Sequence, residues 1–92
     1  MIRCVNDKRV QRLFDGERVV EFRGFARQAE RRLRLLDAAD SLNALRMLPS
    51  NRFEALKGDR AGQYSIRINR QWRICFESDD DGAESVEIAD YH

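Results

Sequence analysis

The second half of the chain alternates apolar and polar residues with a period of two, which predicts antiparallel β-strands. Apolar side chains occupy every other position over about 63–69 and again over about 72–77, with polar residues between them. Successive side chains of a strand point to opposite faces, so one face can enter a core while the other remains polar. The pattern also predicts a short strand at 52–57 and, after the turn sequence Asp79-Asp80-Asp81-Gly82, a last strand at about 84–91.

The first half of the chain shows mainly helical spacing. Residues 2–5 predict a short strand, and Asn6-Asp7 can cap a helix that ends near Gly16. From about 22 to 39, apolar residues recur at intervals of three and four, which predicts an amphipathic helix. The segment 40–49 has helical spacing for one or two turns before its proline.

This order of elements predicts an α+β fold in a single domain spanning residues 1–92. Two helices would pack on one face of a mainly antiparallel sheet of about four to five strands. A chain of 92 residues is long enough to bury one modest core, but it leaves no room for a second domain.

The cysteine content and the hydropathy indicate the compartment. Cys4 and Cys75 are too few for a zinc ligand set or a disulfide scaffold, so we interpret them as reduced, with a Cys4–Cys75 disulfide as the alternative. The first ten residues contain no apolar signal-peptide core, and no window approaches the ~18 apolar residues of a membrane span. We therefore expect a soluble cytoplasmic protein that does not enter a membrane.

Charge is distributed unevenly along the chain, although the formal net charge is only +1. Residues 1–76 contain all 17 Lys and Arg against 9 Asp and Glu, whereas residues 77–92 contain 7 acids and no base. A basic body with an acidic last hairpin can attract a polyanion on one side. The alternative is an ordinary solvated surface with charged loops.

Cations follow the predicted strands, and Arg73 is the most informative of them. It lies between Trp72 and Ile74, so its guanidinium faces away from the core. A forked cation there can grip a scissile phosphate and stabilise the charge of a transition state. The alternative is a cross-strand ion pair, for which Glu87 is a candidate. The full set of cations in this region is Lys57, Arg60, Arg67, Arg70 and Arg73.

The sequence ends with a carboxylate, a phenol and its only imidazole, in Asp90, Tyr91 and His92. An imidazole can transfer protons near neutral pH, and a neighbouring carboxylate can orient it. We expect the last strand to bring these groups beside the cations, a combination that predicts phosphodiester chemistry. The alternatives are a tail residue for His92, an edge-strand aromatic for Tyr91 and a solvated carboxylate for Asp90.

These segments resemble the RelE/HigB family of bacterial toxins, which are small ribonucleases of toxin–antitoxin pairs, and especially its HigB or plasmid-maintenance killer-protein branch. The resemblance covers nearly the whole chain and is carried by the ordered segments Leu56-Lys57-Gly58-Asp59-Arg60, Trp72-Arg73-Ile74 and Asp90-Tyr91-His92. It implies a microbial-RNase-like architecture with the last of these segments at the active site. In one departure, this chain has Glu54 where HigB-type members can place a histidine. Glu54 can replace that histidine as a base, and the alternative is ordinary surface charge.

The resemblance implies a metal-independent endoribonuclease in which the 2′-hydroxyl of RNA attacks the adjacent phosphate. Lys57 and Arg73 would stabilise the resulting charge, while His92 with Asp90, or Glu54, would transfer protons. A base of the RNA would be oriented by Tyr91 or stack on it. The other RNA-binding cations would be Arg60, Arg67 and Arg70. No cluster of His, Cys and carboxylates has metal-ligand spacing, so no metal or other cofactor is expected.

The resemblance also implies the partners. The target would be mRNA in the ribosomal A site, and a co-encoded HigA-like antitoxin with a helix-turn-helix would neutralise the toxin. Operator DNA would be contacted only through the antitoxin complex. Two alternatives keep the fold without the catalysis: a ParE-like inhibitor that blocks its target, and an antitoxin-binding regulatory subunit whose activity was lost with the substitution at Glu54.

The predicted helix at 22–39 carries an arginine stripe, defined as Arg23, Arg27, Arg31 and Arg34. Glu30 is placed to pair with the last of these arginines. A row of cations suits a repeating anionic surface, so we expect it to dock on ribosomal RNA, with acidic residues of the antitoxin as a second candidate. The alternative is a solvated helix face.

Overall fold

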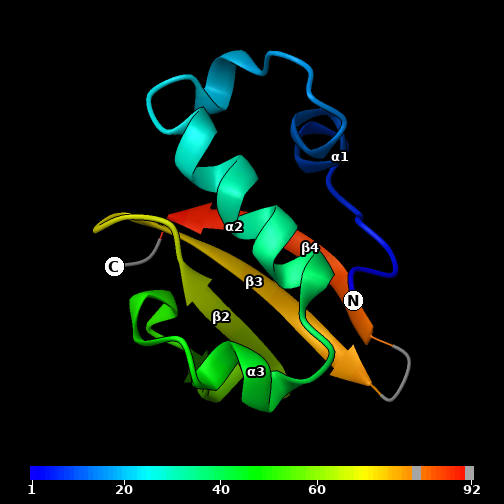
Figure 1. The fold of residues 1–92 in the computed structure, drawn as a ribbon, viewed down its shortest axis with the longest axis vertical. Helices are drawn as coiled ribbons and strands as arrows, with labels where there is room; N and C mark the ends of the chain where they lie inside the picture. Colours follow the sequence, from blue (N-terminus) through cyan, green and yellow to red (C-terminus); the bar gives the residue numbers. More distant parts are fainter. Residues whose placement is uncertain (80–81, 91–92) are drawn as a thin grey trace.

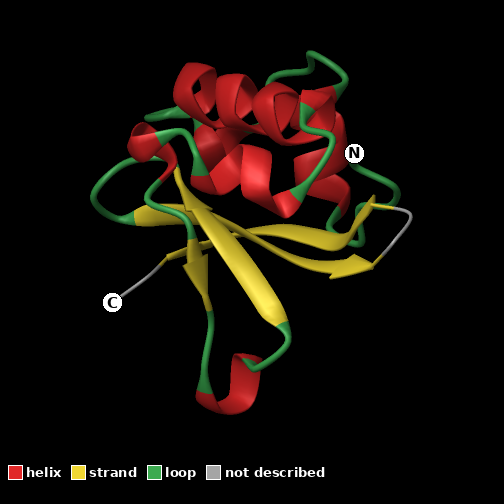
Figure 2. Cartoon of the chain, turned by 60° about the horizontal axis from the view of Figure 1, so that its bottom comes forward, coloured by secondary structure: helices red, strands yellow, loops and turns green. Residues whose placement is uncertain are grey.

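The protein consists of a four-stranded antiparallel sheet with helices on one face, which confirms the predicted α+β class. The computed structural model describes residues 1–79 and 82–90, so Tyr91 and His92 lie outside the described residues. The strands follow the order β1-β2-β3-β4 across the sheet. Their bounds are Glu54–Ala55 (β1), Gln63–Arg67 (β2), Trp72–Asp79 (β3) and Gly82–Asp90 (β4). Figures 1 and 2 show the helices on one side of the sheet, while the other side has no layer over it.

The described part of the chain contains three α-helices and three 3₁₀ turns. The α-helices are α1 (Lys8–Phe14), α2 (Ala26–Ala38) and α3 (Leu42–Arg46), and the 3₁₀ turns are η1 (Val20–Phe22), η2 (Pro49–Asn51) and η3 (Gly58–Arg60). The Asp7 carboxylate caps α1 by accepting a hydrogen bond from the Arg9 backbone amide, as its sequence position predicted. Within residues 1–79 and 82–90, no helix is long and apolar enough to cross a membrane.

The long helix begins four residues later than the spacing predicted. Phe22 and Phe25 are both buried, but Phe22 ends the turn η1 and Phe25 is the cap residue before α2. An interval of three residues fits a 3₁₀ turn as well as an α-helix. The predicted periodicity therefore extended into residues that do pack on the core without belonging to the helix.

The predicted strand at residues 2–5 does not form. Its place is taken by one parallel bridge between Ile2 and Ala83, and the amides of Arg3 and Cys4 both donate to the Ala83 carbonyl. The carbonyl oxygen of Met1 occupies the space into which a Cβ at Gly82 would project. This close approach lets the N-terminal segment lie along β4 without pairing residue by residue. Cys4 and Cys75 are free thiols.

The strand register separates two faces of the sheet, and this separation positions the candidate site. The core face carries the row Ile66–Ile74–Ile88, which packs under the helices. Directly paired residues share a face. The uncovered face, called here the open face, therefore carries two rows: Glu54–Ser65–Cys75–Glu87 and Arg67–Arg73–Ala89.

Candidate functional site

A basic hollow of about 270 Å³ lies where β1, β2 and β3 meet the turn that joins β2 to β3. Its lining contains four arginines, one carboxylate and one amide, from Arg52, Glu54, Arg67, Asn69, Arg70 and Arg73. Several guanidinium groups around one small hollow match the charge and the hydrogen-bonding pattern of a phosphate group. This set, called the basic hollow below, is the candidate functional site.

Arg73 is the most deeply placed of these cations, since only 8% of its surface is exposed. Its Nε donates to the Ser65 hydroxyl at 2.8 Å, and its Nη2 donates to the Arg52 carbonyl. A third, longer bond of 3.5 Å joins Nη2 to the Ser65 carbonyl. The side chain thus crosses β2 toward β1 along the open face, as the alternation of Trp72 and Ile74 predicted.

Arg52 lines the basic hollow and also supplies a backbone acceptor to Arg73. Its φ and ψ angles, 45° and 48°, lie in the left-handed region, which non-glycine residues seldom adopt. The preceding Asn51 is fully buried, where its amide donates to the Leu45 carbonyl at 3.1 Å and its Oδ1 accepts from Arg32 at 2.8 Å. These bonds anchor the end of η2 and hold the Arg52 carbonyl toward Arg73.

The turn after β2 places the other two arginines. The Asn69 Oδ1 accepts from the amides of Gln71 and Trp72, each at 2.8 Å, and so fixes the turn. The Arg67 Nε donates to the Asn69 carbonyl at 3.1 Å, which leaves Arg67 half-buried on the wall of the hollow. Arg70 is exposed at the rim.

Glu54 connects the basic hollow to a second one. It pairs with Ser65 across β1 and β2 and therefore lies on the open face with Arg73. It also lines a neighbouring hollow of about 440 Å³ together with Ala55, Leu56 and Lys57. The structure thus places Lys57 beside Glu54 in an adjoining space, while Lys57 is absent from the lining of the basic hollow.

Arg60 is held away from the basic hollow by an ion pair. Its Nη1 lies 2.7 Å from a Glu87 carboxylate oxygen and also donates to Gln63. This hydrogen bond to Glu87 raises the pKa of the Arg60 guanidinium above its ordinary value. Glu87 was the predicted alternative partner for Arg73, and the structure gives it Arg60 instead.

Cys75 lies on the same face but is not suited to act as a nucleophile. Burial raises the pKa of its thiol, and the nearby Glu87 raises it further, while Arg60 and Arg73 act in the opposite direction. A protonated thiol is a poor nucleophile. In the described part of the chain, no group of three or more His, Cys, Asp or Glu is arranged to hold a metal ion.

Asp90 lies on the other side of the sheet from Arg73. It pairs with Trp72, whose ring stacks on Phe25 of the helical layer at a centroid distance of 4.9 Å. The Asp90 carboxylate accepts a hydrogen bond from the side-chain amide of Gln71 at 3.0 Å. The sequence had suggested that Asp90 would lie beside the cations. The two residues predicted to act with it, Tyr91 and His92, are outside residues 1–79 and 82–90.

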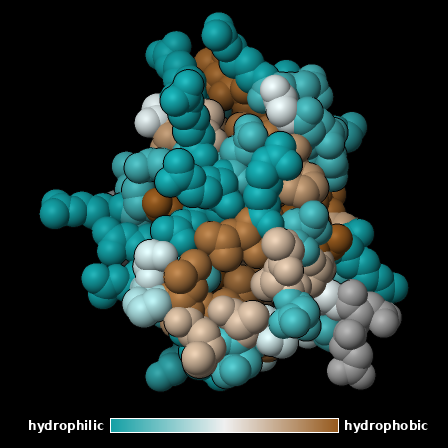
Figure 3. Space-filling view, in the orientation of Figure 1, coloured by the Kyte–Doolittle hydropathy of each residue, from teal (hydrophilic) through white to brown (hydrophobic). Residues whose placement is uncertain are grey.

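The arginine stripe is shorter on α2 than predicted. Arg23 precedes the helix, and Arg34 pairs with Glu30 at 3.2 Å and lies over the Phe14 ring. Arg27 and Arg31 are exposed, and neither forms a hydrogen bond or an ion pair that involves another described residue. Figure 3, in the orientation of Figure 1, shows mostly hydrophilic side chains over the upper part of the molecule and an apolar area toward α3.

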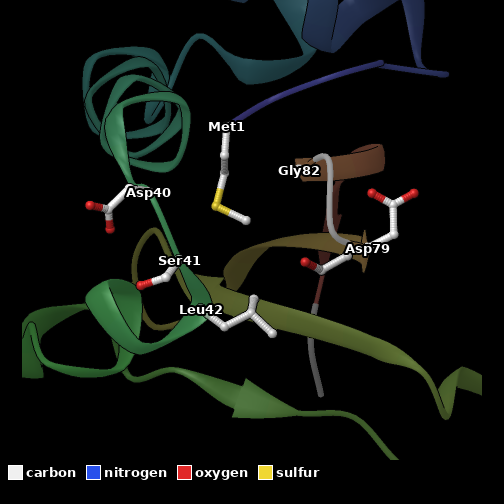
Figure 4. Close-up of a pocket in the computed structure, with 7 residues that line it drawn as sticks. Met1, Asp40, Ser41, Leu42, Asp79 and Gly82 are labelled. Carbon is white, nitrogen blue, oxygen red and sulfur yellow. The ribbon is translucent and has the colours of Figure 1, made fainter.

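A different hollow, shown in Figure 4, lies at the far end of the sheet between α3 and the β3–β4 hairpin. It has a volume of about 390 Å³ and is lined by Met1, Asp40, Ser41, Leu42, Ser78, Asp79 and Gly82. Among the described residues, its lining contains carboxylates but no lysine, arginine or histidine side chain. A phosphate group therefore fits the basic hollow better than this one.

Sequence reasoning missed Arg52, Ser65 and Asn69. The polar position of Ser65 in the alternation of β2 placed it on the face of Arg73, and the Asn69-Arg70-Gln71 sequence is typical of a turn. Both residues could therefore have been named in advance. The contribution of Arg52 is a backbone carbonyl in a left-handed conformation, which no side-chain pattern reveals.

Comparisons with known proteins bear on the family and on the fold. The family model described as the RelE-like toxin of the type II toxin–antitoxin system HigB matches residues 4–92. Toxin HigB-1 of Vibrio cholerae serotype O1 (strain ATCC 39315 / El Tor Inaba N16961) is 49% identical over 47 residues, which are 51% of this chain and 50% of that toxin. The chain thus matches about half the length of this curated relative.

A solved structure, that of the YoeB dimer from Staphylococcus aureus, is similar over almost the whole chain. The match has a TM-score of 0.57 and covers 99% of this chain and 94% of that one. Its sequence identity of 18% is low, so this similarity bears on the fold alone.

Proposed function

Because this chain belongs to the HigB family of RelE-like toxins of type II toxin–antitoxin systems, we propose that it is an endoribonuclease that cuts mRNA on the ribosome and stops translation. The observation that carries the proposal is the buried Arg73 guanidinium at the base of a hollow lined by four arginines. A fixed guanidinium can stabilise the charge that develops on a phosphate in the transition state.

The proposed reaction uses the substrate as its own nucleophile. The 2′-oxygen of RNA forms a bond to the adjacent phosphorus, and the bond from phosphorus to the 5′-oxygen of the next nucleotide breaks. A base takes the proton of the 2′-hydroxyl, and an acid gives a proton to the leaving 5′-oxygen. The products are a 2′,3′-cyclic phosphate and a 5′-hydroxyl end, and the step requires only cations and proton-transfer groups.

Arg73 would contact the phosphate that reacts, with Arg67 and Arg70 on the flanking phosphates. Glu54 is the described candidate for the base, since it lies on the open face and lines the same hollow as Arg73. Lys57 would add charge from the adjoining hollow. The charge of Arg60 is partly offset by its ion pair with Glu87, which makes it the weakest of the proposed contacts.

The residues after β4 complete the proposal. His92 would protonate the leaving oxygen, Asp90 would orient the chain end that carries His92, and Tyr91 would orient or stack on a base. In this scheme Glu54 and His92 divide the two proton transfers, which accounts for a carboxylate at the position where related toxins can have histidine.

The proposed partners follow from the family. A type II toxin has a cognate antitoxin, and we expect a HigA-like helix-turn-helix protein that also carries the toxin to operator DNA. The proposed target, mRNA in the ribosomal A site, would place the reaction in the cytoplasm.

The test is to induce the wild-type chain without its antitoxin for a short time and to map RNA 5′ ends. Growth arrest together with new 5′-hydroxyl ends inside translated mRNAs is expected, and Arg73→Ala should produce neither. Arrest with intact mRNA would instead identify a non-catalytic inhibitor of the ParE kind. In a reconstituted translation system with fixed Mg²⁺ for the ribosome, a chelator specific for transition metals should leave cleavage unchanged.

A further inference from the structure

The Arg73 guanidinium is held along one edge of its fork. The Nε on this edge donates to the Ser65 hydroxyl at 2.8 Å, and the Nη2 on the same edge donates to the Arg52 carbonyl. A guanidinium is planar, so two bonds along one edge fix the orientation of the whole group. Ser65 and Arg52 together therefore define where the rest of the fork points.

The two acceptors are themselves rigid. Ser65 is fully buried in β2, between Glu54 on one neighbouring strand and Cys75 on the other. The Arg52 carbonyl follows Asn51, which is fully buried and bonded to both Leu45 and Arg32. Neither acceptor can follow the guanidinium if it swings, so the orientation is imposed by the scaffold.

We propose that Ser65 is a positioning residue that orients the Arg73 guanidinium for the reacting phosphate. This inference rests on the proposed ribonuclease function. The distinction from simple packing is chemical, because an alanine would fill nearly the same space in β2 but would offer no acceptor to Nε. Ser65 then acts through Arg73 and has no contact with RNA of its own.

The expected effect of losing Ser65 follows from the bonds that remain. In Ser65→Ala the bonds from Nη2 to the Arg52 and Ser65 backbone carbonyls persist, so the guanidinium can pivot about Nη2 without leaving the hollow. A misplacement of about 1 Å can cost roughly 10²-fold in rate. We expect kcat to fall by about 10- to 100-fold with little change in KM, because the electrostatic contact matters most in the transition state.

The experiment measures cleavage of a defined mRNA on reconstituted translating ribosomes by wild type, Ser65→Ala, Ser65→Thr and Ser78→Ala. Ser78→Ala is the matched control, since Ser78 lines the hollow at the far end of the sheet. Ser65→Ala should lose kcat, Ser65→Thr should recover most of it, and Ser78→Ala should cleave like wild type. Introduced into Arg73→Ala, the Ser65→Ala change should cause no further loss, because the pair acts as one unit.

A second readout is independent of catalysis. The Nε–Hε resonance of Arg73, observed by ¹⁵N NMR on the isolated protein, should exchange slowly with solvent in wild type and in Ser78→Ala, and rapidly in Ser65→Ala. Thermal denaturation of each variant shows that the fold is retained. If the threonine methyl group does not fit, Ser65→Thr will show a lower melting temperature. The NMR measurement on Ser65→Ala tests the proposal in that case.

The outcomes separate this inference from the proposed function. Wild-type protein that yields no 5′-hydroxyl ends would overturn both. Wild-type cleavage with an unchanged kcat in folded Ser65→Ala would overturn the role of Ser65 alone. If Ser65→Ala lowers kcat by the same factor in the wild-type and Arg73→Ala backgrounds, Ser65 supports only the strand. That result would also refute the inference.

Discussion

Arg73 and Asp90 project from neighbouring strands to opposite faces of the sheet. Arg73 is paired with Ala89, whereas Asp90 is paired with Trp72, whose ring belongs to the helical side. A carboxylate placed there does not share the basic hollow with the guanidinium. Any effect of Asp90 on a reaction at the open face would therefore be indirect.

Asp90→Asn should accordingly impair cleavage less than Arg73→Ala does. The asparagine Oδ1 can still accept the hydrogen bond from the Gln71 amide, so the strand end should keep its place while the negative charge is lost. The measurement is the single-turnover cleavage rate of both variants on programmed ribosomes. Equal losses in the two variants would indicate that Asp90 acts on the phosphate site directly.

Arg73→Ala should reduce the cleavage rate by about 10²- to 10³-fold, since loss of one preorganised electrostatic contact costs about 3–4 kcal/mol. Arg70→Ala is the matched control from the same hollow, because Arg70 is exposed at its rim. Its loss should be smaller and should appear mainly in KM. A soluble Arg73→Ala variant that remains toxic and still cuts mRNA would rule out the phosphate role.

The period of two in the last strand determines the face of Asp90. Val86 and Ile88 are buried, and a period of two places Asp90 on their face. The same rule correctly placed Arg73 on the open face. Where the period of three was ambiguous, at Phe22 and Phe25, the sequence could not distinguish a 3₁₀ turn from the first turn of α2.

Other features depend on tertiary contacts that no local pattern encodes. The N-terminal segment was expected to form a strand from its β-prone residues, but Arg3 and Cys4 share one acceptor on β4 and do not extend the ladder. The Arg52 carbonyl reaches Arg73 only because Asn51 is anchored to α2 and α3. The cations on the strands and the Ser65 hydroxyl were thus predictable from the alternation, while the Arg52 carbonyl, which also orients Arg73, was not.

Glu54→Gln should lower kcat if Glu54 takes the proton of the 2′-hydroxyl. General-base catalysis contributes about 10²–10⁴-fold, so a loss in that range is expected. Glu54→His restores a base and should recover part of the rate. An unchanged kcat in folded Glu54→Gln would assign the base to another residue.

Asp7→Ala should destabilise the fold by about 1 kcal/mol, because it removes the N-cap of α1. The side-chain hydrogen bond from Arg9 lowers the pKa of the Asp7 carboxyl, against the effect of burial. A lowered pKa contributes stability above the ordinary carboxyl value and loses it as pH falls through the folded value. Urea denaturation should therefore show a difference between wild type and Asp7→Ala at pH 7 that narrows in acid. The exposed Asp40, changed to alanine, is the control, and a difference that widened in acid would contradict this assignment.

Reversal of Arg27 and Arg31 to glutamate should weaken association with ribosomes while antitoxin affinity changes less. Both side chains are exposed on α2, whereas Arg34 is already occupied by Glu30 and Phe14. The helix α2 covers the side of the sheet opposite the open face, so its cations would not take part in the reaction. They would instead contribute to docking on ribosomal RNA phosphates, and this part of the affinity would fall as the salt concentration rises.

The matched control for the α2 pair reverses Lys8 and Arg18, two exposed cations outside α2, which changes the net charge equally. Co-sedimentation at fixed salt should show a larger loss for the α2 pair than for this control. Equal losses would attribute the effect to overall charge, and unchanged binding of the α2 pair would mark the arginines as a solvated helix face.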